Sequence, residues 1–190
     1  MNNNINHIIH YRYFLLRLFL LLLPVNFSQV NGIAQTPPPN AEYQLKAVFI
    51  YNFTRFVEWP PEAFESYNDP FVIAIIGNDP FGTYLEQAVN GESIGRHPIR
   101  VKRIEHLDNT EKCHILFINE KDPDKIKAIL DEAENTNILT VSDAANFADI
   151  GGMIGFYKEN NKIRMEINAT VARNAQLNIS SKLLRLAKVK

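Results

Sequence analysis

The residues best suited to chemistry in this sequence are Cys113 and His114, which are adjacent, with His97 and His106 a short way upstream. Structural zinc sites present paired ligands at short fixed intervals, and one cysteine with scattered histidines does not supply four of them. A catalytic Cys–His pair is disfavoured because neighbouring residues of a strand point to opposite faces. We therefore expect a small buried cysteine beside a histidine at the end of a strand, with no metal ligand and no catalytic residue.

A second candidate is the segment at residues 77–82 (GNDPFG), which follows an apolar run and precedes a helical pattern. Phosphates often bind at this position in α/β folds, at the N-terminus of the helix. The glycine spacing matches neither the dinucleotide fingerprint nor the P-loop, and Asp79 would repel a phosphate. We interpret the segment as a structural turn and expect no cofactor; a small-ligand pocket here remains the alternative.

The acidic side chains lack the close pairing that carboxylate catalysis requires. Those considered are Glu58, Glu62, Glu86 and Glu166. No G-x-S-x-G elbow is present, and Ser180 with Ser181 stands where a helix cap is expected. The sequence thus argues against an enzyme, and a hydrolase ranks third among the hypotheses. Glu166 stands out because strand alternation directs it outward near a polar C-terminal segment, although a solvated strand face is the simpler explanation.

Three apolar runs have the pattern of strands that are covered on both faces. They occupy residues 71–76, 115–118 and 138–141. A helix start follows each run, at Pro80, at Pro123, and at Ser142 or Asp143. Repeated strand–helix–strand units predict an α/β fold with a mostly parallel sheet and helices on both faces, which makes a three-layer sandwich.

The segments that flank these units have different patterns. An apolar helix is expected from residue 41 to Trp59, and its face is wide enough to be buried on more than one side. Its repeating apolar positions are Leu45, Val48, Phe49, Phe53 and Phe56. Residues 99–104 alternate apolar and basic side chains, which predicts a half-exposed strand near the sheet edge. Residues 152–157 and 162–167 predict an antiparallel C-terminal hairpin, and short helices are expected after Asn168 and Ser180.

The N-terminus has the layout of a secretory signal peptide: Arg12 and Arg17 lead into an apolar run, and small residues end at Ala34. We expect cleavage after Ala34, so that residues 1–34 are the signal peptide; a retained membrane anchor is the alternative. Residues 35–40 predict a flexible, proline-rich leader, and residues 41–190 a single domain. No cysteine lies near the cleavage point, which excludes a lipid anchor.

Charge and cysteine content restrict the partners and the sources of stability. Removal of the signal segment would leave eighteen basic and twenty-one acidic residues, a balance that does not favour nucleic acid. A single cysteine allows no intramolecular disulfide in an oxidising compartment, so stability must come from packing.

Eight strings resemble the YfiR family, in order along nearly the whole predicted domain. They are residues 46–60 (KAVFIYNFTRFVEWP), 76–82 (IGNDPFG), 95–99 (GRHPI), 113–118 (CHILFI), 138–143 (ILTVSD), 151–156 (GGMIGF), 165–168 (MEIN) and 177–189 (LNISSKLLRLAKV). Each string is weak alone, but their common order makes the resemblance specific.

The resemblance implies a periplasmic, Rossmann-like α/β regulator without a catalytic centre. Its implied partner is a membrane-bound signalling protein such as a diguanylate cyclase or a histidine kinase, with an outer-membrane lipoprotein as a further partner. Family members commonly form homodimers, and some carry disulfides, which the single Cys113 does not provide within this chain.

A regulator of this kind needs a surface that binds one state of its target better than another. We expect that surface on the hairpin and the C-terminal segment; the alternative is that its apolar members are ordinary core. The predicted residues are Phe156, Met165, Glu166, Asn168, Ile179, Ser181 and Arg185. A small-ligand-binding periplasmic sensor is the second hypothesis for function.

Overall fold

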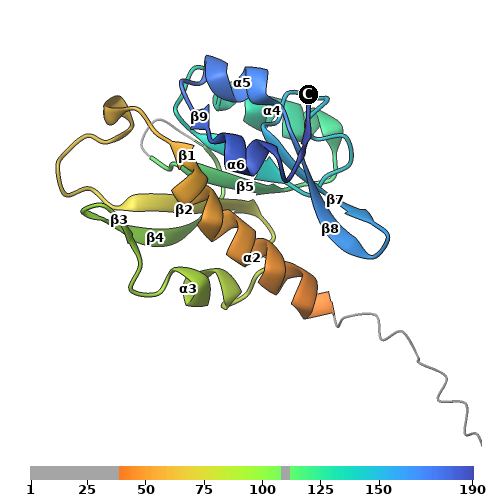
Figure 1. Ribbon diagram of the computed structural model, residues 1–190, viewed down its shortest axis with the longest axis horizontal. Coiled ribbons are helices and arrows are strands. Elements are labelled where there is room, and N and C mark those ends of the chain that lie inside the picture. Colours follow the sequence, from red (N-terminus) through yellow and green to blue (C-terminus); the bar gives the residue numbers. More distant parts are fainter. Residues whose placement is uncertain (1–38, 108–111) are drawn as a thin grey trace, which may run out of the picture. The chain divides into compact units, whose positions relative to one another are not determined.

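The computed structural model describes residues 39–107 and 112–190 (Figure 1). The predicted signal peptide lies outside these residues. The helices are α2 (Pro39–Phe56), η1 (Pro61–Ala63), α3 (Tyr84–Val89), α4 (Pro123–Glu132), α5 (Ala169–Asn174) and α6 (Ser181–Leu184). The strands are β1 (Val57–Glu58), β2 (Phe71–Gly77), β3 (Ser93–Ile94), β4 (His97–Ile104), β5 (Ile115–Asn119), β6 (Leu139–Ser142), β7 (Ile154–Glu159), β8 (Lys162–Ile167), β9 (Asn178–Ile179) and β10 (Lys188–Val189).

Eight of the described strands form one sheet in the order β10-β8-β7-β6-β5-β2-β4-β3. The five strands β4, β2, β5, β6 and β7 run parallel. Numbered along the chain, they are arranged 2-1-3-4-5, one of the two common orders of doubly wound α/β folds. Strand β8 returns antiparallel to β7, and the two-residue turn between them places Asn160 and Asn161 at positive φ, as a type I′ hairpin requires.

Both faces of the sheet are buried, and strand alternation divides the core into two clusters. Ile73 and Phe117 belong to the cluster that α2, α3, α5 and α6 cover. Ala74 and Leu116 belong to the opposite cluster, which α4 and Phe147 cover. Helices therefore lie on the two sides of the sheet (Figure 1), and the prediction of a three-layer, mostly parallel α/β fold with an antiparallel C-terminal hairpin is confirmed.

Several element predictions agree closely with the structure. The three apolar runs form β2, β5 and β6, and the residues predicted near the edge form β4, with only β3 beyond it. The side chain of Asn168 caps α5 by accepting a hydrogen bond from the Val171 N–H at 3.1 Å. Ser180 caps α6 in the same way. Helix α2 begins at Pro39, two residues before the expected start of order.

The helix predicted from Ser142 or Asp143 is wrong. The segment that follows β6 makes consecutive turns, in which Asn146 has φ 58° and Gly151 has φ 104°. A right-handed helix cannot accommodate these positive φ values. The buried hydroxyl of Ser142 accepts a hydrogen bond from the Ala144 N–H at 3.0 Å, which resembles a helix cap although no helix follows.

Two helix boundaries also differ from the prediction. The helix expected from Pro80 begins only at Tyr84, because Gly82 has φ 58° and interrupts the helical backbone. Helix α2 ends at Phe56, because the next two residues leave it to pair with β9. Within the described residues, no helix is both long and apolar enough to cross a membrane.

Candidate functional site

The carboxyl edge of the sheet is where doubly wound folds usually bind ligands, between the strands at which the winding reverses. Here those strands are β2 and β5. Gly77 at the end of β2 has φ 89°, and a Cβ on it would lie 2.3 Å from the carbonyl oxygen of Asn119 at the end of β5. The Asn119 side-chain amide also donates a hydrogen bond to the carbonyl of Asn78. The two strand ends are thus in close contact at this crevice.

The turn at residues 77–82 is held by one guanidinium. Arg103 of β4 donates to Asp79 through Nε at 2.9 Å and through Nη2 at 2.5 Å. It also donates to the carbonyl of Gly82 at 3.0 Å and forms an ion pair with Glu86 of α3. The hydrogen bonds to Glu86 and Asp79 raise the pKa of Arg103. These contacts support the prediction that this segment is a structural turn. The carboxylate of Asp79 is neutralised by Arg103 of the same chain.

A buried lysine lies further along the same edge. Lys46 of α2 is only 3 % exposed, and its Nζ lies 2.5 Å from Asp143 Oδ2 and 2.7 Å from Glu42 Oε1. The Tyr43 hydroxyl donates to Asp143 at 3.0 Å. Burial and the adjacent Asp143 carboxylate raise the pKa of Tyr43, whereas hydrogen bonds from Lys46 and Lys158 lower the pKa of Glu42. This network fastens α2 to the end of β6 and to the hairpin.

Sequence reasoning missed Lys46 as a site residue, although it belongs to one of the family strings. A signal was present, because Lys46 stands on the same side of the helix as Ile50 and Phe53, which are fully buried. A lysine on an apolar stripe requires a buried carboxylate partner, but the sequence does not identify which carboxylate the fold supplies.

The amino edge of the sheet brings together aromatic residues from three of the family strings. The His114 ring lies 4.6 Å from Phe64 and 4.5 Å from Phe71, while Phe64 stacks on His97 at 4.0 Å. Trp59 packs against Phe71 at 4.8 Å, and its Nε1 donates to the carbonyl of His114 at 3.2 Å. The described loop before β2 is therefore pinned to the strands by an unbroken series of ring contacts.

His114 is neutral in this stack. Its Nδ1 accepts a hydrogen bond from the Val72 N–H at 3.0 Å, which places the proton of the neutral ring on Nε2. Nε2 is buried and makes no hydrogen bond with the described residues. The nearby backbone carbonyl of Ala63 raises the pKa of the His114 ring, but this effect is smaller than that of burial. Burial dominates and lowers the pKa of His114 to about 4.

The four residues considered for metal or Cys–His chemistry are not assembled into one site. Cys113 is buried in the cluster beneath α4, whereas His114 stacks on the opposite side of the sheet, as strand alternation predicts. His97 is bound through Nδ1 to the carbonyl of Asp69 at 2.6 Å, and His106 is exposed. Residues 39–107 and 112–190 contain no group of three or more metal-ligating side chains close enough to hold an ion.

The apolar members of the predicted partner surface are buried. Phe156, Met165 and Ile179 are 3 %, 4 % and 9 % exposed, and all three belong to the core cluster beneath α2. Phe156 stacks on Phe53 of α2 at 5.9 Å. These positions agree with the alternative considered for them, that they are ordinary core, and a role in partner binding stays a prediction.

The polar members of the predicted surface are more accessible, and two of the four have structural partners. Glu166 lies 3.0 Å from Lys190 and 3.2 Å from Lys188, contacts that contribute to lowering its pKa against the opposing effect of burial. The Asn168 amide donates to the carbonyl of Ala148 at 3.1 Å, in addition to capping α5. Ser181 and Arg185 are exposed on and just after α6.

Accessible aliphatic side chains lie in the C-terminal segment, where Leu186 and Val189 are 66 % and 48 % exposed, and on α2. Leu45 and Val48 are 45 % and 43 % exposed, although the sequence pattern predicted that the helix is buried on more than one side. Helix α2 buries Ala47, Ile50 and Phe53 and leaves its outer side open, because no described element packs over it.

This chain folds as a doubly wound α/β domain, as its sheet order and the helices on both faces of the sheet show. The model of the family described as YfiR/HmsC-like matches residues 43–188, which is most of the chain, and the protein therefore belongs to this family. A comparison with curated proteins found no match. Membership connects the chain with periplasmic regulation of signalling and agrees with the resemblance in its sequence strings.

Proposed function

We propose that this protein is an exported, non-catalytic regulator that binds a membrane signalling protein, such as a diguanylate cyclase or a histidine kinase, and represses or modulates it. The observation that carries this proposal is the family match over residues 43–188. In this proposal the chain reaches the periplasm through a signal peptide cleaved after Ala34, acts as a homodimer, and is released from its target by an outer-membrane lipoprotein.

In this proposal, the hydrogen bonds and ion pairs at the carboxyl edge hold the fold together. The polar groups at this edge are engaged with one another: Asn119 with the β2 turn, Arg103 with two carboxylates, and Lys46 with two others. A regulator requires no reacting group, because it acts by binding one conformation of its target more tightly than another.

Recovery of the target from membranes tests the proposal. The full chain, carrying a tag and produced in its own bacterium, is isolated from gently solubilised membranes. Sequencing of its N-terminus from the periplasmic fraction tests cleavage after Ala34. Recovery of a cyclase, kinase or receptor in stoichiometric amounts is the expected result. Recovery of none, or turnover of a substrate by the purified protein, would contradict the proposal.

A small-ligand sensor is the second candidate, and a cavity of about 530 Å³ between α4, β6 and α5 favours it. Its lining includes Lys127, Thr140 and Asn174. It does not include the turn at residues 77–82, where the sequence placed the alternative pocket. Thermal-shift screening against amino acids and nucleotides separates the two candidates, because a ligand that binds the native state must raise the melting temperature.

A further inference from the structure

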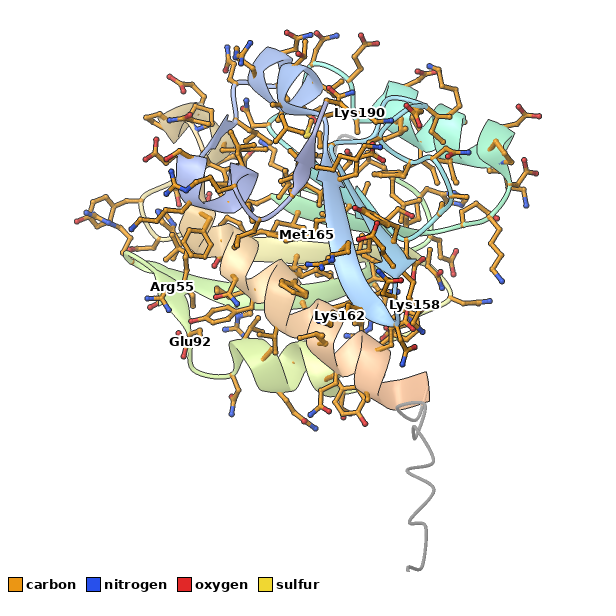
Figure 2. All side chains as sticks on the ribbon, turned by 45° about the vertical axis from the view of Figure 1, so that its right-hand side comes forward. Arg55, Glu92, Lys158, Lys162, Met165 and Lys190 are labelled. Carbon is orange, nitrogen blue, oxygen red and sulfur yellow. The ribbon has the colours of Figure 1, made fainter. Side chains whose placement is uncertain are left out.

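Residues 168–190, which form α5, β9, α6 and β10, carry charge of one sign only. They contain five basic and no acidic side chains, whereas the residues that precede them contain fifteen basic and twenty-one acidic ones. Figure 2 shows Lys190 at the opposite end of β8 from Lys158 and Lys162, so the lysines near the hairpin turn are separate from this group. The five cations are Arg173, Lys182, Arg185, Lys188 and Lys190.

Only part of this positive charge is neutralised by carboxylates of the described chain. Lys188 and Lys190 both pair with Glu166, and Lys190 also pairs with Asp149. The other three cations form no ion pair with residues 39–107 or 112–190. Salt screens exposed charges that are more than about 8 Å apart, so more distant acids do not cancel the local positive charge.

Two aliphatic side chains are exposed among these cations. Leu186 and Val189 are the most exposed large aliphatic side chains of the described residues. The helical turn of α6 continues to Leu186, whose N–H donates to the carbonyl of Leu183 at 3.0 Å. Lys182 therefore lies about one turn from Leu186, and Arg185 directly precedes it, so all three share the outward side of this turn while Leu183 is buried.

Val189 lies on the same side of the sheet as α6. In the parallel pair of β10 with β8 it is the register partner of Ile167, which belongs to the core cluster that α6 covers. Its neighbour Lys188 points to the other face of the sheet, as strand alternation requires, and meets Glu166 there. We name Lys182, Arg185, Leu186 and Val189 the α6–β10 face.

From this combination we infer that the α6–β10 face binds the surface of a membrane that contains anionic lipids. Leu186 and Val189 enter the headgroup region, while Lys182 and Arg185 meet the lipid phosphates. A cluster of four or more lysines and arginines is attracted to anionic lipid, and each cation near the surface adds to the attraction. The inference goes beyond the proposed function, because it concerns lipid and requires no signalling protein.

A lipid surface fits this face better than an acidic protein segment does. Residues 168–190 contain no tryptophan or tyrosine, which together with arginine are enriched where protein interfaces bind most strongly. The exposed side chains of Lys182 and Arg185 are held by no ion pair of the described chain. Fixing such long side chains opposite the carboxylates of a protein costs entropy, whereas mobile lipid phosphates attract them without a fixed geometry.

Flotation with lipid vesicles tests the inference. The protein is purified from the periplasmic fraction and mixed with phosphatidylethanolamine vesicles that contain about one third phosphatidylglycerol, or with phosphatidylcholine vesicles, which carry no net charge. The wild type should bind the anionic vesicles more tightly than the neutral ones by about tenfold or more, and added salt should weaken this binding.

Two variants separate the contributions of the α6–β10 face. Leu186→Asp removes its most exposed aliphatic side chain. Lys182→Glu combined with Arg185→Glu reverses its two charges that form no ion pair with the described chain. Each variant should weaken binding to the anionic vesicles by about tenfold or more.

Matched controls carry the same changes outside the basic segment. Leu45→Asp replaces an exposed leucine of α2, and Lys121→Glu combined with Lys162→Glu changes the net charge equally at two exposed lysines. At physiological ionic strength these controls should bind within about twofold of the wild type. All the proteins share the same N-terminal residues, so these residues cannot cause a difference between them. Equal melting temperatures ensure that weaker binding reflects the lost contact rather than unfolding.

Three outcomes would overturn the inference. The wild type could bind anionic and neutral vesicles equally or bind neither, or the controls could lose as much binding as the two variants do. In a third outcome the wild type does not float, and the reversal of Lys182 and Arg185 abolishes recovery of the membrane signalling partner, which would assign the face to an acidic protein segment. Because flotation uses only the protein and lipid, its failure leaves the proposed function to its own test.

Discussion

Acidification from pH 7 to pH 5 should destabilise this protein by about 2 kcal/mol through His114 alone. The ring is 4 % exposed, stacks between two phenylalanines and accepts the Val72 N–H through Nδ1. A second proton would have to occupy Nδ1, so protonation would break that hydrogen bond and place a cation among aromatic rings. His97 and Asp69 are the neighbouring titratable groups, and their opposing effects are smaller than that of burial.

The sign and size follow from the two pKa values of this histidine. In the unfolded chain the ordinary pKa is 6.5, and in the folded protein it is about 4. Between these values the unfolded state binds more protons, so the stabilisation is complete above pH 6.5 and is lost progressively as the pH falls toward 4. A difference of this size corresponds to about 3 kcal/mol in total, a large share of the stability of a small domain.

Urea unfolding of the wild type and two variants at pH 7, 6 and 5 measures this effect. In His114→Asn the side-chain carbonyl can still accept the Val72 N–H but does not titrate, so its free energy of unfolding should fall by less than about 0.5 kcal/mol over this range. His106→Gln removes an exposed histidine and should keep the wild-type dependence. An equal fall in wild type and His114→Asn would refute the assignment of the pH dependence to this ring.

Three further substitutions test the contacts that hold the fold. Lys46→Met leaves two carboxylates without their buried cation and should destabilise by about 3 kcal/mol, whereas Lys127→Met breaks an exposed pair and should change the urea midpoint little, under about 1 kcal/mol. Gly77→Ala places a methyl group against the carbonyl of Asn119 and should lower the free energy of unfolding by about 3 kcal/mol. In the control Gly82→Ala the new Cβ meets open space, and the loss should be about 1 kcal/mol. Gly77→Ala should therefore have the lower melting temperature of the two in thermal denaturation. Phe53→Ala empties a fully buried site beneath α2 and should lower the free energy of unfolding by about 4 kcal/mol in the same urea assay; a loss below about 1 kcal/mol would mean that α2 is not packed as described.

The sheet could be predicted because each of its central strands has a recognisable local sequence pattern. Mostly apolar runs that contain β-branched residues formed β2, β5 and β6, and the side chains of Asn168 and Ser180 capped helices where helices were expected. The helix predicted after β6 was wrong because Ser142 accepts a hydrogen bond as a helix cap does, whereas Asn146 further along has a positive φ. Local capping chemistry cannot reveal that later reversal.

The candidate site was harder to predict because its contacts join distant parts of the chain. Lys46 and Asp143 are 97 positions apart, and no local pattern pairs them. The burial of Phe156 and Met165 and the exposure of Val48 also depend on which element covers which face. Periodicity identifies an apolar stripe, but only the tertiary arrangement decides how much of that stripe is covered.

The pairing of β1 with β9 has a consequence for biogenesis. It joins Glu58 and Asn178 across 120 positions, so the segment just after the first described helix is completed by one of the last segments to be made. Any vectorial process, such as synthesis on the ribosome or passage through an export channel, therefore releases α2 long before its covering elements exist. During that interval Phe53 and its neighbours lack the partners that bury them, so α2 can take its final packing only after the C-terminal segment has emerged.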